Sequence, residues 1–265
     1  INSPALLLRS KAPDPNNRVG KRTFLHPTAF SFAQFDKDIS PFYGAPQSIY
    51  SDHFQWKNGA KGPLGYKLEV PPLHPGITSA LLMGHGEKQV DDLSKLANTN
   101  AMIALMRDGF HYESEGANIE LSDDGSPIID YPINDYLWTG IKHSHLSMTK
   151  IQFAAGAKRA RLAHSDAKWF DSFGEFEKGL ENTSYQASSV LIGSAHVMGG
   201  LAMGENKDLC LVDSECKYHY LDNLWVFDGS VFPTSMGANP QLSIYGMACR
   251  LATGLAEKLS GKTLS

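Results

Sequence analysis

The chain has 265 residues, which is the length of one large domain or two smaller ones. Of these residues, 42% are hydrophobic and 20% charged, a composition that can form a sizeable buried core and that excludes a disordered chain. The net charge of -4 argues against a dedicated nucleic-acid binder, which usually has a basic surplus. Three cysteines cannot all pair, which excludes a disulfide scaffold, and no apolar run reaches the roughly 20 residues of a membrane-spanning helix.

The first residues, from Ile1 onward, have the pattern of a strand-to-helix transition inside a domain, and no charged leader precedes them. We therefore expect the chain to be the C-terminal portion of something longer, with any localisation signal in the part that precedes it. Further along, short apolar runs predict strands at 64–70, 78–83, 102–106, 117–121 and 127–131. The turn at 123–125 predicts a hairpin between the last two, and the spacing favours a mainly antiparallel sheet.

Helical patterns follow the predicted strands. Apolar residues at helical spacing predict helices over 144–157, over 171–180 and, most clearly, over 242–259. Asn239 has the residue type of an N-cap for the last helix, and Pro240 suits its first position. The run 223–228 before this helix reads as a fully buried strand. Together these elements predict an α/β architecture joined to an antiparallel sheet region.

Two segments carry the residues that suggest chemistry. Segment 196–204 has three glycines around His196, which is typical of a loop where the backbone approaches another group closely. Segment 228–241 has an acidic residue, Asp228, then Gly229, and it ends where the last helix begins. The open end of a helix can stabilise negative charge. A histidine and an asparagine brought together there can share a substrate hydroxyl, the asparagine orienting it and the histidine moving the proton.

Here the sequence resembles the glucose-methanol-choline (GMC) family of flavin oxidoreductases. Four motifs carry the resemblance, in the family's order and spacing: Ser-Pro-x-Leu-Leu-Leu-x-Ser from Ser3, His-Val-Met-Gly-Gly-x-x-Met-Gly from His196, Asn-Leu-Trp-Val-Phe-Asp-Gly-Ser-x-x-Pro from Asn223, and Gly-Ala-Asn-Pro-Gln from Gly237. The first motif departs from the family signature at Lys11, where the family has glycine.

The resemblance implies a mixed α/β (α+β) fold. An antiparallel-sheet substrate domain would pack on the C-terminal part of a Rossmann-like FAD-binding domain whose N-terminal part is missing. It implies that 1–20 belong to the FAD-binding domain, that 21–185 form the substrate domain, and that 186–265 return to the FAD-binding domain with the catalytic pair. The implied activity is oxidation of a small-molecule alcohol to an aldehyde or ketone, by hydride transfer to the N5 atom of the flavin.

The same resemblance assigns roles to single residues. His196 matches the family's catalytic base, and Asn239 matches the position that holds asparagine or histidine and orients the substrate oxygen. Asp228 and Gly229 match residues that lie against the ribityl–pyrophosphate chain of FAD. Asn239, Pro240 and Gln241 would bring the start of the last helix to the flavin pyrimidine edge, where it stabilises negative charge.

Segment 68–72 looks like the part of cholesterol oxidase that carries an active-site glutamate, so Glu69 is a candidate second acid–base or substrate-orienting group. The Gly-x-Gly-x-x-Gly fingerprint of such flavoproteins is absent from the 265 residues. We therefore expect the chain alone to bind FAD weakly or not at all, and to need the missing N-terminal FAD-binding segment as a partner.

Two other classes of function compete with this reading. The first is a non-catalytic subunit or remnant domain that keeps the fold for protein interaction; the presence of both His196 and Asn239 counts against it. The second is a metal-dependent hydrolase, but the ten histidines include no His-x-x-x-His spacing. His143 and His145 diverge on a helix, so we predict no metal site. Cys210 and Cys216 leave a small disulfide open, and Cys249 is predicted in the core.

Overall fold

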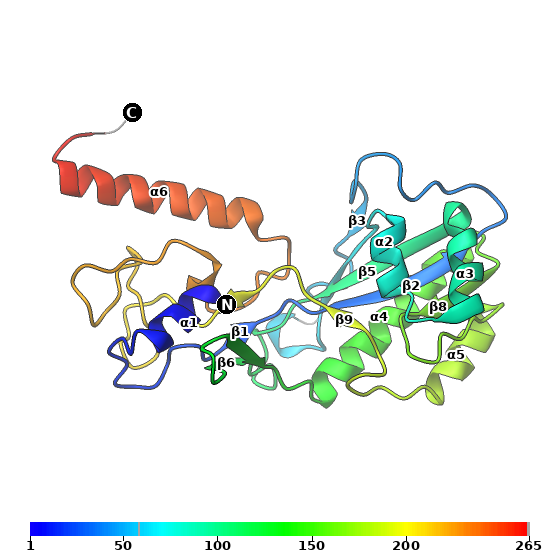
Figure 1. Ribbon diagram of the computed structural model, residues 1–265, viewed down its shortest axis with the longest axis horizontal. Helices are drawn as coiled ribbons and strands as arrows, with labels where there is room; N and C mark the ends of the chain where they lie inside the picture. The colour runs from blue at the N-terminus through cyan, green and yellow to red at the C-terminus, as the bar shows by residue number, and fades with distance from the viewer. Residues whose placement is uncertain (58, 264–265) are drawn as a thin grey trace. The chain divides into compact units, whose positions relative to one another are not determined.

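The computed structural model describes residues 1–57 and 59–263. The chain forms two compact units, each built from separate stretches of sequence. The first unit contains 1–26, 108–132 and 194–265, and the second contains 27–107 and 133–193 (Figure 1). Segment 108–132, which the sequence analysis placed inside the substrate domain, thus groups with the two ends of the chain.

The second unit is built on a six-stranded sheet with β3, β4, β5, β2 and β8 as consecutive neighbours, while β9 pairs with the start of β2. All of these pairings are antiparallel, and β2 pairs along its whole length with β5. The strands are β2 (Thr28–Gln34), β3 (Tyr50–Ser51), β4 (Tyr66–Glu69), β5 (Thr99–Met106), β8 (Arg159–Leu162) and β9 (Ile192–Gly193). The predicted mixture of helices with an antiparallel sheet is confirmed.

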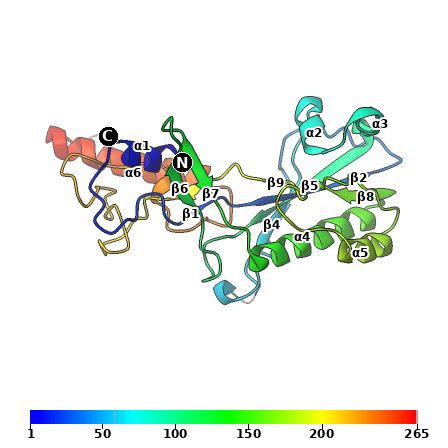
Figure 2. The same ribbon diagram turned by 60° about the horizontal axis from the view of Figure 1, so that its bottom comes forward.

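Helices cover both faces of this sheet (Figure 2). On one face, Ser31 of β2 donates to Gln152 of α4 (Asp135–Ala154) at 2.6 Å, and α5 (Phe173–Glu181) packs beside α4. The next residue of β2, Phe32, points to the opposite face because side chains alternate along a strand. There it packs in a core cluster with Leu82 and Leu96, beneath α2 (Pro75–Leu81), α3 (Gly86–Ser94) and the short 3-10 turn η2 (Leu96–Asn98).

The predictions of strands and helices for this unit succeed with one exception. Strands at 64–70 and 102–106 and helices at 144–157 and 171–180 correspond to β4, β5, α4 and α5. The predicted strand at 78–83 is wrong, because this run lies mostly in α2. Pro75 occupies the first turn of α2 and His74 precedes it in extended backbone, a combination that favours a helix start. A short apolar run does not by itself distinguish the two structures.

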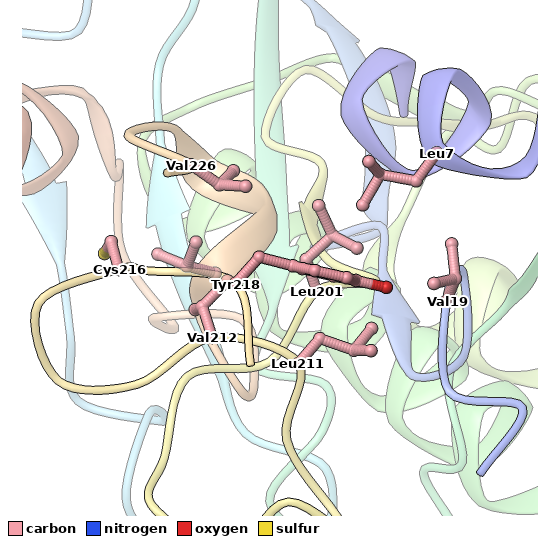
Figure 3. Packing of buried hydrophobic residues seen from close by; sticks show 9 residues of the cluster. Leu7, Val19, Leu201, Leu211, Val212, Cys216, Tyr218 and Val226 are labelled. Carbon is pink, nitrogen blue, oxygen red and sulfur yellow. The ribbon is translucent and has the colours of Figure 1, made fainter. Parts of the chain in front are cut away.

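The first unit has less regular structure. It contains α1 (Asn2–Arg9), the two-residue strands β1 (Thr23–Phe24) and β10 (Met198–Gly199), the hairpin of β6 (Asn118–Leu121) and β7 (Pro127–Asp130), the turn η3 (Gly229–Val231) and α6 (Gln241–Ser260). The predicted hairpin is confirmed. A buried cluster holds the loops together around Tyr218 (Figure 3). The hydroxyl of Tyr218 donates to the carbonyl of Pro13 at 2.9 Å.

Two predictions at the end of this unit need correction. The last helix is present, but it begins at Gln241 with Pro240 as its N-cap, so Asn239 is not the cap. The predicted strand at 223–228 is irregular backbone, with one bridge from Trp225 to Lys217. A buried strand needs backbone partners along its edges. Here the bridge is flanked by two bonds, from the Val226 N–H to the carbonyl of Cys216 and from the Tyr218 N–H to the carbonyl of Leu224, which do not extend into a strand ladder.

The structure also tests the expectations about the cysteines and about membrane-spanning helices. Cys210, Cys216 and Cys249 are free thiols, so the disulfide considered for the first two is not formed, and Cys249 is exposed on α6 rather than in the core. Among the described residues we find no helix with the length and apolar character needed to cross a membrane.

The packing of α5 gives a test of the fold. An alanine methyl at Gly179 would overlap the buried ring of Phe170, whereas one at Gly174 in the same helix meets nothing within 4 Å. We expect Gly179→Ala to lower the free energy of unfolding by about 1–3 kcal/mol through overpacking. Gly174→Ala should be neutral or stabilise by up to about 1 kcal/mol, because alanine favours a helix. Denaturant unfolding of both variants checks this, and equal effects would contradict the described packing.

Candidate active site

His196 lies just before β10, separated from it by Val197, and His26 lies just after β1, separated from it by Leu25. The two strands pair antiparallel, with Thr23 opposite Gly199 and Phe24 opposite Met198. Continuing this register brings His26 opposite His196, and opposed residues of an antiparallel pair are cross-strand neighbours. The Nδ1 atoms of the two rings are 3.0 Å apart, at hydrogen-bond distance. Strand register therefore creates a histidine pair from residues that are 170 positions apart.

The glycines after His196 allow this close pairing. Gly199 has φ of +85° and Gly200 has φ of +93°, a left-handed conformation that glycine adopts without strain. A side chain on Gly199 would overlap the carbonyl oxygen of Arg22, and one on Gly200 would lie 2.8 Å from Pro4 of α1. The structure thus accounts for the glycine-rich character of the segment through its close approach to the chain around β1 and α1.

Asp108 anchors the backbone that carries His26. The carboxylate accepts from the backbone N–H groups of Leu25 and His26, each at 3.1 Å, and from the hydroxyl of Tyr131 at 2.9 Å. Ser235 fixes the same residue from another segment, donating to the backbone carbonyl of Asp108 at 2.8 Å. Both Asp108 and His26 are fully buried. One carboxylate thus ties three distant segments of the first unit together at the histidine pair.

This burial changes the proton affinity of the anchor. Removal from water raises the pKa of Asp108 to about 6, and the hydrogen bonds that stabilise its charged form offset only part of that effect. Burial and the adjacent Asp108 carboxylate also raise the pKa of Tyr131. Tyr131 therefore keeps its proton and acts as a hydrogen-bond donor to Asp108.

Asp228 organises the second predicted segment. Its carboxylate accepts from the hydroxyl of Ser3 in α1 and from the backbone N–H of Ser230 at 2.7 Å, which caps the turn η3. Burial acts to raise the pKa of Asp228, but the hydrogen bonds from Ser230 and Ser3 help to hold it below its usual value. Gly229 is tightly placed: a side chain there would lie 3.1 Å from Ile244 of α6. The first and third sequence motifs thus meet at one carboxylate.

Asn239 is exposed, and Pro240 behind it is buried. They lead directly into α6, whose first turn contains no acidic residue and whose N-terminus has no hydrogen bond from a capping side chain. Gln241, the first helical residue, is exposed and donates to the hydroxyl of Tyr245 at 2.7 Å. The helix start therefore presents backbone N–H groups and the positive end of the helix dipole.

Glu69 belongs to the second unit, so it is not part of the cluster around His196 within the first unit. It is buried and forms an ion pair with Lys67 at 2.9 Å, and the Lys67 ammonium lies over the ring of Tyr50. Glu69 lines a largely apolar cavity of about 360 Å³, within the volume range of ligand sites. Other walls come from Leu68, Met102 and Ile151.

The sequence analysis missed His26 and Asp108 as site residues. The following Pro27 favours extended backbone at His26, yet this residue has a left-handed φ of +50°. His26 could have been found only by predicting that segment 21–26 pairs with the loop that carries His196. His143 and His145 bond to the hydroxyls of Tyr66 and Tyr185, and no set of three potential metal ligands occurs in the described ranges.

Comparison with known proteins identifies the family of this site. The sequence model of the family described as GMC oxidoreductase matches residues 114–248, a stretch that includes His196, Asp228 and Asn239. This match covers half of the chain. The chain belongs to the GMC oxidoreductase family. FAD is the cofactor of this family, as the resemblance implied.

Relatives and solved structures agree with this assignment. An uncharacterized GMC-type oxidoreductase of Mycobacterium tuberculosis is 26% identical over 96% of this chain, and a long-chain-alcohol oxidase of Arabidopsis thaliana is 26% identical over 99%. The chain spans 38% and 36% of these two proteins. The crystal structure of pyridoxine 4-oxidase from Mesorbium loti matches 95% of the chain and 49% of its own length, with a TM-score of 0.66 at 16% identity, which supports the fold.

The buried anchor predicts a pH dependence of stability. Because the pKa of Asp108 is about 6 in the folded state and near 3.9 in an unfolded chain, the folded protein binds the proton more tightly. The contribution of Asp108 to the free energy of unfolding therefore falls by about 2 kcal/mol as pH rises from 4 to 6. Asp108→Asn should remove this component. Denaturant unfolding of both proteins at pH 4, 5, 6 and 7 measures it, and identical pH slopes would contradict the assignment.

Proposed function

We propose that the protein takes part in FAD-dependent oxidation of an alcohol to an aldehyde or ketone, with His196 as the base. The observation that carries this proposal is the position of His196. It stands in the matched family region, half-buried, with its ring held by hydrogen bonding through Nδ1 at 3.0 Å from His26. A ring held at one nitrogen has a fixed orientation, so the other nitrogen, Nε2, can be aimed at a substrate hydroxyl.

The chain's residues divide the work on the substrate. His196 takes the hydroxyl proton through Nε2 as the C–H bond breaks. Asn239 has an amide that can donate to or accept from the same oxygen, and its exposure before α6 suits contact with a small molecule. FAD, when bound, supplies the acceptor for the hydride. Glu69 remains our candidate for a second, substrate-orienting group, since an ion-paired carboxylate accepts hydrogen bonds.

The donor set of the first unit fits the cofactor. The uncapped start of α6, at Pro240 and Gln241, offers backbone N–H groups and positive potential to an electron-rich ring edge. Asp228 and Gly229 would hold the ribityl–pyrophosphate chain, the carboxylate accepting from its hydroxyl groups. We expect stable FAD binding to require an N-terminal FAD-binding segment in addition to the described residues.

The role of His196 is tested in the complete gene product. We expect His196→Asn to retain FAD, measured by visible absorption, and to lower alcohol turnover roughly 100- to 10,000-fold because proton removal is lost. The exposed histidine His53 provides a matched control, and His53→Asn should turn over as the parent does. Parental turnover in His196→Asn would refute the role. A parent protein that binds no FAD and oxidises no alcohol would favour the non-catalytic subunit instead.

The role of Asn239 predicts a different kinetic effect. Asn239→Leu removes a hydrogen bond to the substrate oxygen, so we expect flavin reduction to slow by roughly 10-fold or more with FAD content unchanged. Asn239→His, the other residue type that the family carries at this position, should retain most of the rate. Stopped-flow reduction measures both, with the exposed Asn182→Leu as the control for an asparagine replaced elsewhere. Equal rates in the leucine and histidine variants would contradict the role.

A further inference from the structure

The histidine pair has a property that follows from hydrogen counting. The two Nδ1 atoms face each other at 3.0 Å, with the ring planes inclined by 32°. A hydrogen bond at this distance needs one donor and one acceptor. A neutral imidazole carries a hydrogen on one ring nitrogen and a lone pair on the other. When both rings are neutral, only one of the facing nitrogens can carry the hydrogen, and the choice fixes the tautomer of each ring.

The two choices differ in what His196 can do. If His196 donates through Nδ1, its Nε2 atom carries a lone pair and can accept a proton. If His26 donates, Nε2 of His196 already carries a hydrogen and the ring can act only as a donor there. We propose that His26 is the positioning residue that accepts from His196 Nδ1 and so holds His196 in the tautomer of a base. This inference rests on the proposed function, because it assumes that His196 accepts a proton.

The surroundings of His26 suit a fixed acceptor. Its side chain is fully buried, and its backbone N–H is held by Asp108 at 3.1 Å. Its φ of +50° is unusual for a residue other than glycine, and even more so before Pro27. Such backbone outliers persist where surrounding contacts over-determine them, and they concentrate at functional sites. The surrounding contacts thus keep His26 in a strained backbone conformation that holds its ring opposite His196.

The same hydrogen bond also stabilises the protonated form of His196. Once His196 has taken a proton at Nε2, its Nδ1 still carries a hydrogen aimed at His26. The bond becomes charge-assisted, and such bonds are roughly twice as strong as neutral ones. His26 therefore stabilises the imidazolium that forms during proton transfer, without itself touching substrate or gaining a proton.

Two variants of His26 distinguish its role as a hydrogen-bond acceptor from its contribution to packing. His26→Phe keeps a buried ring but removes the acceptor. His26→Asn places a carbonyl oxygen near the former Nδ1 position and tolerates a left-handed backbone. With histidine labelled by nitrogen-15, long-range proton–nitrogen spectra of the full chain report which nitrogen of each of the ten histidines carries hydrogen. The spectrum of His196→Asn assigns the His196 signals.

We expect His196 to be the Nδ1–H tautomer in the parent and in His26→Asn, and to lose that fixed state in His26→Phe. Turnover of the flavin-loaded protein should fall roughly 10- to 100-fold in His26→Phe, mainly in kcat rather than KM, and recover in His26→Asn. An Nε2–H tautomer of His196 in the parent, or an unchanged tautomer in folded His26→Phe, overturns the inference. If the tautomer behaves as expected but His196→Asn retains parental turnover, the proposed function fails while the tautomer assignment stands.

Discussion

The antiparallel register between β1 and β10 is the constraint on which the candidate site depends. Only Thr23, Phe24, Met198 and Gly199 form this short ladder, yet it decides which side chain stands opposite His196. A slip by one residue would turn the side chains to the other face and remove the histidine pair. The close approach of Gly199 to β1 and the anchoring of the following backbone by Asp108 oppose such a slip. Local packing and candidate chemistry are thus set by the same contacts.

The two units are held together by different kinds of interaction. The second unit is a sheet with helices on both faces, and alternation along β2 sends Ser31 to one helix layer and Phe32 to the other. Its stability follows from regular burial, and its apolar cavity lies among these regular elements. The first unit has few regular elements and relies on buried polar anchors, Asp108 and Asp228, that connect segments far apart in the sequence. Buried carboxylates with several donors restrict geometry strongly, which suits a site that must hold hydrogen-bonding groups in place.

Sequence alone predicted what is local. The hairpin of β6 and β7, the helices α4, α5 and α6, and the family motifs each depend on residues close together in the chain, and the structure contains them. The failures have different causes. For 78–83 a local signal was present, because Pro75 suits the start of a helix, while 223–228 lacks the strand partners that its apolar pattern suggested. His26 was missed because its importance arises from a pairing across 170 residues that no local pattern encodes.

A neutral partner behind the base has a consequence for the chemistry. A carboxylate in contact with His196 would favour the imidazolium before any substrate arrives, because an opposite charge stabilises the protonated ring. A neutral imidazole selects the tautomer through a lone pair without adding a charge. In the hydrogen bonds described above, the buried carboxylate of Asp108 accepts from the backbone N–H of His26 rather than from either ring. The arrangement separates two tasks: Asp108 fixes where the positioning residue stands, and His26 fixes which nitrogen of His196 is ready to receive a proton.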